Sequence, residues 1–182
     1  MKLNLGCGEN HKEGYVNVDK LGSPDITHDL ESFPWPWGDK SIDEIYMNHI
    51  LEHLGETSDV YIKVIQELYR ICKPGAIIQI NVPHPRHDDF ISDPTHVRAV
   101  MPLSLALFNQ AENKRWVEGG YANSPLGIYH KVDFEIMNIV IVPDEPYRQD
   151  LIEKKVTSEE VSELMKYHNN VVKEIQITWK RV

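Results

Sequence analysis

The sequence is poor in cysteine and has no long apolar run. Its only cysteines are Cys7 and Cys72. Two thiols so far apart do not form the disulfide framework that stabilises small extracellular domains, so we expect a reducing, cytoplasmic environment. No segment approaches the roughly 20 apolar residues that cross a bilayer, and the first residues lack the pattern of a secretory signal. These absences predict a cytoplasmic protein without a membrane partner.

Positive charge is also scarce. Lysine and arginine number 19 against 28 aspartates and glutamates, and the formal net charge is −9. Because extended nucleic-acid binding depends on many cations that neutralise phosphates, this balance argues against DNA or RNA and favours a small-molecule partner. A hydrophobic content of 41% and a charged content of 26% are typical of a globular protein. We expect a single domain over residues 1–182, and the oligomeric state is left open.

Apolar periodicity predicts several short strands and one long amphipathic helix. Strands are expected over residues 3–5, 15–19, 25–29, 42–47 and 76–82, and a helix over 58–72, capped by Thr57 or Ser58. The strand at 76–82 is apolar except for Gln79 and Asn81, which is typical of a parallel sheet buried on both faces. Two alternating segments, 132–142 and 171–182, predict further strands around a short helix over 158–167. This order predicts an α/β fold with a mainly parallel sheet.

Two segments do not fit this regular order. Periodicity weakens from about residue 84 to residue 130, where only 103–108 is expected to be helical, so we expect an insertion or lid there. The segment Phe33–Trp37 contains two prolines, which exclude regular structure. Its residues Trp35 and Trp37 either cover a ligand or pack as a rigid loop.

Three strand ends carry residues suited to a nucleotide-like cofactor. Gly6-Cys7-Gly8 follows the first strand, where glycine permits unusual backbone angles and lets a ligand approach main-chain N–H groups. Asp19 ends the second strand, where an acid can accept both hydroxyls of a ribose. Asp29 and Leu30 follow the third strand and can meet an adenine ring. Each piece alone also has an ordinary explanation, as a tight strand exit or an acid that begins a turn.

Taken together, these segments resemble the class I S-adenosylmethionine-dependent methyltransferases, and more narrowly their small type 11-like members. The segments that carry the resemblance, over roughly residues 2–100, are Leu3–Gly8, Gly14–Asp19, Asp29–Leu30, Ser41–His53 and Leu68–Gly75. The resemblance implies a Rossmann-like sheet with an antiparallel C-terminal strand, S-adenosylmethionine as cofactor, and methyl transfer to a small molecule. Similar small members often accompany sugar and polysaccharide enzymes, which implies a sugar or polysaccharide precursor as acceptor.

The resemblance also implies which residues bind the cofactor. They are Gly6, Cys7, Gly8, Asp19, Lys20, Asp29, Leu30, Asn48 and His49. The glycines would lie against the methionine portion, Asp19 would hold the ribose, Asp29 and Leu30 would flank the adenine, and the backbone around Asn48 and His49 would close over the sulfonium.

Three departures from the family pattern bear on the other functions that the chain could have. Asn4 stands where the family usually has an acid, so it can orient the loop but cannot pair ionically with the cofactor's amino group. This substitution leaves open a second function, that of a scaffold protein that binds the cofactor without catalysis. Residues 9–14 leave room for barely one helical turn between two parallel strands, a shortened first crossover. That shortening, together with Asn10 in place of the family's usual third glycine, disfavours a further alternative, an NAD-dependent oxidoreductase.

Residues 82–98 leave the carboxyl edge of the predicted sheet and hold three histidines and three aspartates. A histidine fixed by a carboxylate can act as a general base, and we assign that role to His84 and His96. Arg86 or Arg98 would anchor an anionic acceptor. The same residue types suit a metal site or a locally bonded polar loop. Because prolines interrupt any helix that would align them, we assign no metal ligand.

Overall fold

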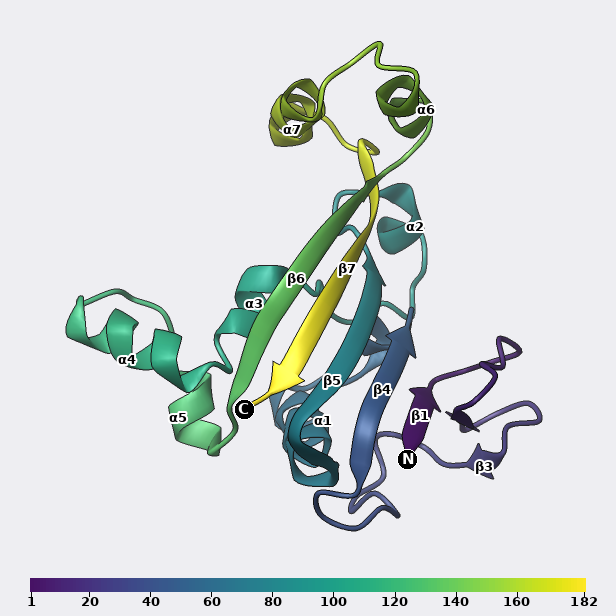
Figure 1. Cartoon of the computed structure of the whole chain (residues 1–182), viewed down its shortest axis with the longest axis vertical. Coiled ribbons are helices and arrows are strands. Elements are labelled where there is room, and N and C mark those ends of the chain that lie inside the picture. The colour runs from purple at the N-terminus through teal and green to yellow at the C-terminus, as the bar shows by residue number, and fades with distance from the viewer.

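A seven-stranded mixed sheet, ordered β3-β2-β1-β4-β5-β7-β6, runs through the molecule (Figure 1). The computed structural model describes all 182 residues. The strands are β1 (Lys2–Leu5), β2 (Val16–Asp19), β3 (Ile26–Thr27), β4 (Ile42–Asn48), β5 (Cys72–Pro83), β6 (Phe134–Pro143) and β7 (Val172–Arg181). The first five pair in parallel, whereas β7 is antiparallel to both β5 and β6. The predicted α/β class, parallel sheet and antiparallel C-terminal strand are confirmed.

The helices lie mostly in the second half of the chain. They are α1 (Ser58–Ile71), α2 (Asp88–Ile91), α3 (Pro102–Ala106), α4 (Gln110–Glu118), α5 (Leu126–His130), α6 (Tyr147–Ile152) and α7 (Ser158–Tyr167), with a 3-10 turn η1 (Leu51–His53). The predicted α1 and α7 are confirmed, and the side chains of Thr57 and Thr157 cap them. Helices α4 and α6 were not predicted, because they are mostly polar and show no apolar periodicity. Only Asn113 and Trp116 of α4 are buried, and no residue of α6 is. No helix combines the length and apolar character needed to cross a membrane.

The first two crossovers of the sheet contain no helix. Residues 6–15 join β1 to β2 and residues 20–25 join β2 to β3, both as turns and loops. The predicted shortening of the first crossover is therefore confirmed. In parallel sheets these crossovers normally carry helices that cover one face. In Figure 1 the strands lie in front, and helices α1 and α3 lie behind the sheet. The face toward the viewer is therefore not covered by crossover helices.

The uncovered face carries polar side chains that pair across strands. Asn81 donates to Asn48 Oδ1 at 2.9 Å and to the Tyr46 hydroxyl at 3.2 Å. The Thr178 hydroxyl donates to Gln79 Oε1 at 3.0 Å. The prediction that β5 is buried on both faces is therefore wrong, because Gln79 and Asn81 are only half-buried. The physical reason is that no crossover helices cover this face. Its polar side chains therefore form hydrogen bonds with each other and with water.

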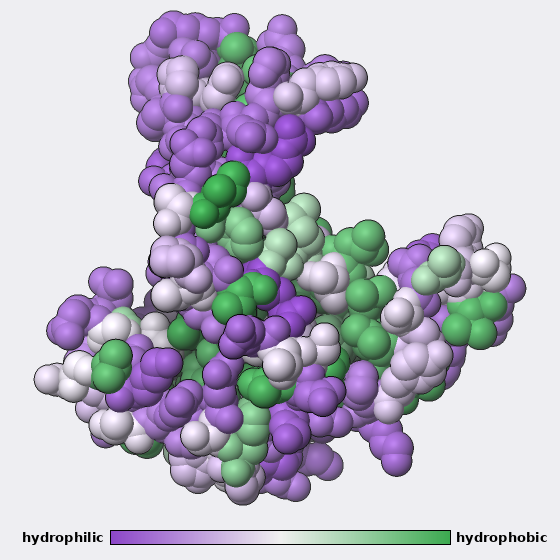
Figure 2. Space-filling view, turned by 180° about the vertical axis from the view of Figure 1, so that it is seen from behind, coloured by the Kyte–Doolittle hydropathy of each residue, from purple (hydrophilic) through white to green (hydrophobic).

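The opposite face holds the core. Helix α1 contributes the buried side chains Tyr61, Val64, Ile65, Leu68 and Ile71, at the spacing of one helix face. They join alternate residues of β4, β5 and β7 in one cluster. Trp35 and Trp37 belong to this cluster and meet edge to face at 6.1 Å. The aromatic loop therefore packs rather than covers a ligand, and it fills space beside α1. Seen from behind, apolar residues gather below the lobe of α6 and α7 (Figure 2). The exposed apolar residues of the chain include Ile139 and Ile141 of β6.

Glu67 of α1 ties the aromatic loop to the helix. Its Oε2 accepts from the Trp35 amide and from Arg70 Nη2, both at 2.6 Å, and its Oε1 accepts from Arg70 Nε at 2.8 Å. Arg70 first, and the Trp35 amide after it, hold the pKa of Glu67 below its ordinary value of 4.5.

We expect Glu67→Gln to lower the free energy of unfolding by about 1–3 kcal/mol near neutral pH, because charged hydrogen bonds are lost. The folded carboxyl has the lower pKa, so its contribution is present above pH 4.5 and is lost as the pH falls through the folded value. Urea denaturation at pH 7 and at about pH 3 measures the difference between the two proteins. A difference that is as large in acid as at neutral pH contradicts the assignment.

Candidate active site

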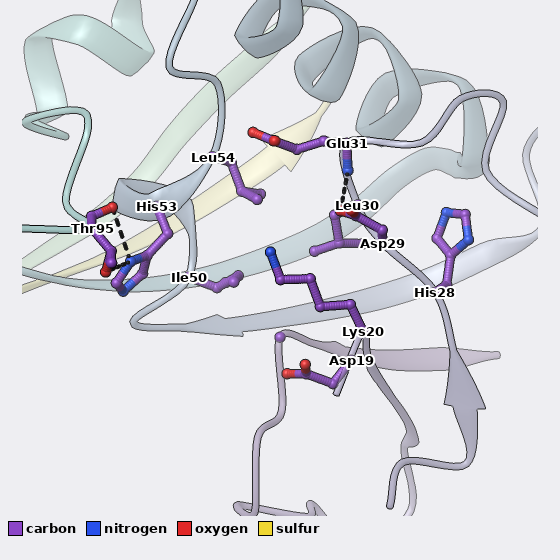
Figure 3. A pocket seen from close by; sticks show the side chains of 11 residues that line it. Asp19, Lys20, His28, Asp29, Leu30, Glu31, Ile50, His53, Leu54 and Thr95 are labelled. Atoms are coloured by element: carbon purple, nitrogen blue, oxygen red, sulfur yellow. Dashed lines mark hydrogen bonds between the residues drawn. The ribbon is translucent and has the colours of Figure 1, made fainter. Parts of the chain in front are cut away.

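A cavity of about 310 Å³ opens at the carboxyl ends of β1, β2 and β3, next to η1 (Figure 3). It is lined by Gly6, Asp19, Lys20, His28, Asp29, Leu30, Glu31, Ile50, His53, Leu54 and Thr95. Ligands of open α/β sheets bind at this edge. Five of the predicted cofactor residues line the cavity, namely Gly6, Asp19, Lys20, Asp29 and Leu30.

The turn after β1 is fixed by its neighbours. Gly6 has a φ of +67°, and its amide donates to Val18 O at 2.8 Å. A Cβ on Gly6 would lie 2.3 Å from Ile50 Cγ1, so only glycine fits there. Asn4 is buried and donates to Asn10 O at 3.0 Å and to Asn17 Oδ1 at 2.9 Å. The amide that replaces the expected acid thus orients this loop.

Asp19 and Asp29 face the same opening from neighbouring strand ends (Figure 3). Asp19 accepts from the Gly8 amide at 2.8 Å and, through its other oxygen, from the Leu21 amide at 3.0 Å. Asp29 accepts from the Glu31 amide at 3.0 Å. These bonds fix both carboxylates, and each oxygen retains a lone pair for a ligand. Preorganised acceptors of this kind are suited to hydroxyl and amine donors.

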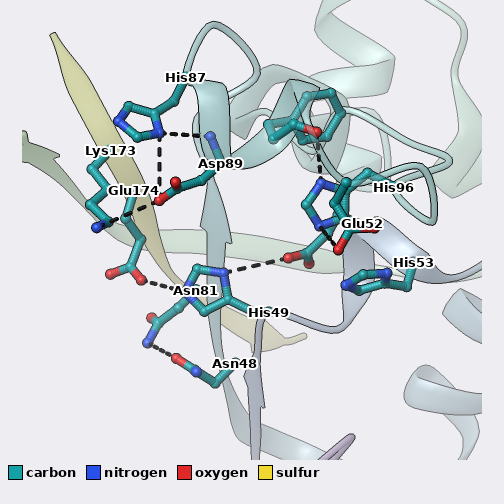
Figure 4. A network of polar contacts seen from close by, with 12 residues as sticks. Asn48, His49, Glu52, His53, Asn81, His87, Asp89, His96, Lys173 and Glu174 are labelled. Carbon is teal, nitrogen blue, oxygen red and sulfur yellow. Dashed lines mark hydrogen bonds and ion pairs between the residues drawn. The ribbon is translucent and has the colours of Figure 1, made fainter. Parts of the chain in front are cut away.

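Four predicted cofactor residues do not line the cavity. Cys7 is buried behind the turn and Gly8 is exposed beside it. Asn48 pairs with Asn81 on the polar sheet face. His49 lies near β7 (Figure 4), where Glu174 first and Glu52 second raise its pKa to about 9. This part of the chain reaches the cavity through Ile50, His53 and Leu54 instead, because the turn η1 directs those side chains inward.

The sequence pattern contained part of this signal. Ile50 and Leu54 are four residues apart, and His53 lies beside them in a segment already matched to the family. Thr95 could not be assigned from the sequence, because it reaches the cavity from the loop after α2.

The two predicted base candidates lie in different surroundings. His96 follows Thr95 at the edge of the cavity, and its Nδ1 donates to Phe90 O at 2.8 Å. His84 does not line the cavity, and its Nδ1 accepts from the Arg86 amide at 3.2 Å. Burial lowers the pKa of His84, and the charge of Arg86 lowers it further. The structure therefore brings only His96 to the edge of the cavity, where its ring centroid lies 4.5 Å from that of the lining residue His53.

The two arginines predicted as anchors already have partners within the chain. Arg86 donates to Met165 O at 2.8 Å, which attaches the loop to the end of α7. Arg98 donates to Gly55 O at 2.7 Å, and its guanidinium lies 4.1 Å from the Tyr61 ring centroid. Neither side chain lines the cavity, and the expectation that one of them anchors an anionic acceptor stays a prediction. The carbonyls that they bind, those of Met165 and Gly55, lie far from them in the sequence. Only the tertiary fold brings these groups together.

Comparison with solved structures identifies the fold. An S-adenosylmethionine-dependent methyltransferase from Archaeoglobus fulgidus matches with a TM-score of 0.64 and 19% identity, over 99% of this chain and 85% of that one. The 1,6-didemethyltoxoflavin-N1-methyltransferase of Burkholderia thailandensis, solved with bound 1,6-didemethyltoxoflavin and S-adenosylhomocysteine, matches with a TM-score of 0.55 and 13% identity, over 100% of this chain and 70% of that one. The chain has the class I methyltransferase fold. The [4+2]-cyclase SpnF also matches this chain, with a TM-score of 0.52 and 15% identity over 99% of this chain and 74% of that one. No family model and no curated protein sequence matches the chain.

Within this methyltransferase fold, the cavity carries an excess of negative charge. Asp19, Asp29 and Glu31 line it, against one ammonium group, that of Lys20. Glu31 also accepts from the Gly55 amide at 2.7 Å, which joins η1 to the adenine side predicted for Asp29. A cavity of this charge favours a cationic ligand over an anionic one.

Proposed function

We propose that the chain is an S-adenosylmethionine-dependent methyltransferase that acts on a small-molecule acceptor. The observation that carries the proposal is the pair Asp19 and Asp29, held at adjacent strand ends around one cavity. Asp19 is placed to accept from ribose hydroxyls, while Asp29 and Leu30 offer a polar edge and an apolar surface to adenine. Gly6 leaves room for the methionine portion beside Ile50. When bound, the cofactor supplies an electrophilic methyl group on its sulfonium.

Two features favour this cofactor over NAD. S-adenosylmethionine is cationic, which complements the three carboxylates around the cavity, whereas NAD carries a pyrophosphate. Dinucleotide sites place that pyrophosphate at the N-terminus of the helix after the first strand. Residues 6–15 contain no helix, so the chain lacks this anion site.

The acceptor would enter beside His53, Thr95 and His96, where the loop after α2 meets η1. A sugar or polysaccharide precursor is the acceptor class that we propose to test first. His84 does not line the cavity, so it is not our first choice for a role in proton transfer. His96 is better placed, and its free Nε2 is available either as a base or as a ligand.

Asp19→Asn tests the cofactor assignment. We expect this variant to bind S-adenosylmethionine and S-adenosylhomocysteine at least about tenfold more weakly, or about 1.4 kcal/mol, because a neutral amide is a poorer acceptor for ribose hydroxyls. Isothermal titration calorimetry of both proteins measures the loss. NAD should not bind to either.

Glu118→Gln is the matched control, since it removes one carboxylate from the exposed end of α4, outside the cavity. Unchanged affinity in Asp19→Asn, or an equal loss in the control, would refute the ribose assignment. Turnover is then tested with methyl-labelled cofactor and fractionated cell extract. Binding without transfer of label supports the scaffold alternative instead.

A further inference from the structure

A buried carboxylate and two imidazoles meet beside the cofactor cavity. Glu52 and His53 belong to η1, whereas His96 comes from the loop after α2 (Figure 4). Their nearest ligand atoms all lie within 4.8 Å of one another. His53 also lines the cavity, so the cluster borders the proposed active site. His96 lies more than forty positions after Glu52 and His53 in the sequence, and only the fold brings it to them.

Glu52 has only one long ion pair, with His49, where a buried carboxylate requires close hydrogen-bond donors. It is 0% exposed, and neither of its oxygens accepts a hydrogen bond. The nearest cationic group is His49, whose Nδ1 lies 3.5 Å from Oε1 while its Nε2 binds Glu174 at 2.8 Å. Burying an ionised carboxylate without close donors is strongly unfavourable. A cation coordinated by its oxygens would remove that penalty.

The two histidines are oriented as metal ligands usually are. His96 Nδ1 donates to Phe90 O at 2.8 Å, which leaves Nε2 as the unprotonated nitrogen. His53 Nδ1 lies 3.0 Å from the Thr95 hydroxyl and 3.2 Å from Thr95 O, so its Nε2 is free as well. Asp93 in turn accepts from the Thr95 hydroxyl at 2.6 Å. Such outer contacts fix the tautomer and the ring plane of a ligating histidine.

We propose that Glu52, His53 and His96 bind a divalent transition-metal ion. Two imidazoles and one carboxylate are a ligand set that suits Zn²⁺ or Fe²⁺ and does not suit Mg²⁺ or Ca²⁺. Metal–ligand bonds of about 2.0–2.2 Å require these atoms to move closer together than the 4.8 Å within which they lie, which side-chain rotation supplies. In this proposal His96 is a metal ligand rather than a base. From the sequence we assigned no metal ligand, whereas the proposal now assigns three. The proposal does not depend on methyl transfer.

Zn²⁺ titration of the full chain, without an affinity tag and after treatment with chelator, tests the site. We expect one Zn²⁺ per chain by calorimetry and native mass spectrometry, and visible absorption bands when Co²⁺ is added. Glu52→Gln, His53→Gln and His96→Gln should each weaken Zn²⁺ binding at least tenfold. His168→Gln is the matched control, because it removes an exposed histidine far from the cluster along the chain.

Thermal unfolding separates a metal ligand from a merely structural residue. Zn²⁺ should raise the midpoint of the wild type and of His168→Gln, and the three cluster variants should lose that shift. His53 is half-buried, so its variant is the one least dependent on core packing and decides the test if Glu52→Gln does not fold. Absence of stoichiometric binding to the wild type, or equal binding by His53→Gln and wild type, overturns the proposal.

Discussion

Gly6→Ala is expected to destabilise the protein and to abolish most of its cofactor affinity. The added Cβ would lie 2.3 Å from Ile50 Cγ1 and 2.7 Å from Ile50 Cβ. Overpacking of this kind costs about 1–3 kcal/mol, and a left-handed backbone costs alanine a further 1–2 kcal/mol or so. Because Ile50 lines the cavity, the displaced side chain would enter the space that we assign to the methionine portion. We expect a loss in unfolding free energy of about 2–5 kcal/mol and cofactor binding at least about tenfold weaker.

Gly8→Ala provides the matched control for this experiment. Gly8 also has a positive φ, +48°, but a Cβ there meets nothing within 4 Å. Its replacement should therefore cost only the backbone strain, about 1–2 kcal/mol. The double variant Gly6→Ala/Ile50→Ala should recover part of the stability, since the overlap is relieved. If Gly6→Ala costs no more than Gly8→Ala by urea denaturation, the close packing of Gly6 on Ile50 is not the reason for glycine.

Trp179→Ala is expected to cost about 3–5 kcal/mol of unfolding free energy. The indole is fully buried on the covered side of β7, where it stacks on Phe134 with centroids 3.8 Å apart and meets Phe108 edge to face at 6.2 Å. Its removal would leave a large cavity between the sheet and the chain that follows α3. Since many domains have only about 5–15 kcal/mol in total, the variant should be marginally folded.

The neighbouring residue on β7 supplies the comparison. Thr178 points to the uncovered face and makes one hydrogen bond, to Gln79. Thr178→Ala should therefore cost about 0.5–1.5 kcal/mol. Trp179→Phe should cost less than Trp179→Ala, because it keeps most of the ring and removes an indole N–H that has no partner. Equal losses in Trp179→Ala and Thr178→Ala would contradict the one-sided core.

Local sequence rules predicted the helix and strand positions where each element carries its own signal. Helix α1 begins after a threonine cap and presents one apolar face, so its bounds could be predicted closely. The same holds for α7, whose capping box Thr157–Glu160 stands in the sequence. Helix α4 could not be predicted, since its main buried anchors are Asn113 and Trp116 and their partners lie in α5 and the loops around it. Burial of that kind is a tertiary property.

The sequence by itself determined the fold class, the shortened first crossover and five residues around the cavity, because glycines and acids at strand ends are local signals. The tertiary structure alone decided which face of the sheet is covered, since that depends on helices the first crossovers do not contain. It also decided that Arg86 and Arg98 are bound within the chain. Finally, it brought Glu52 and His53 to His96, because a contact between distant segments leaves no periodic pattern in either one.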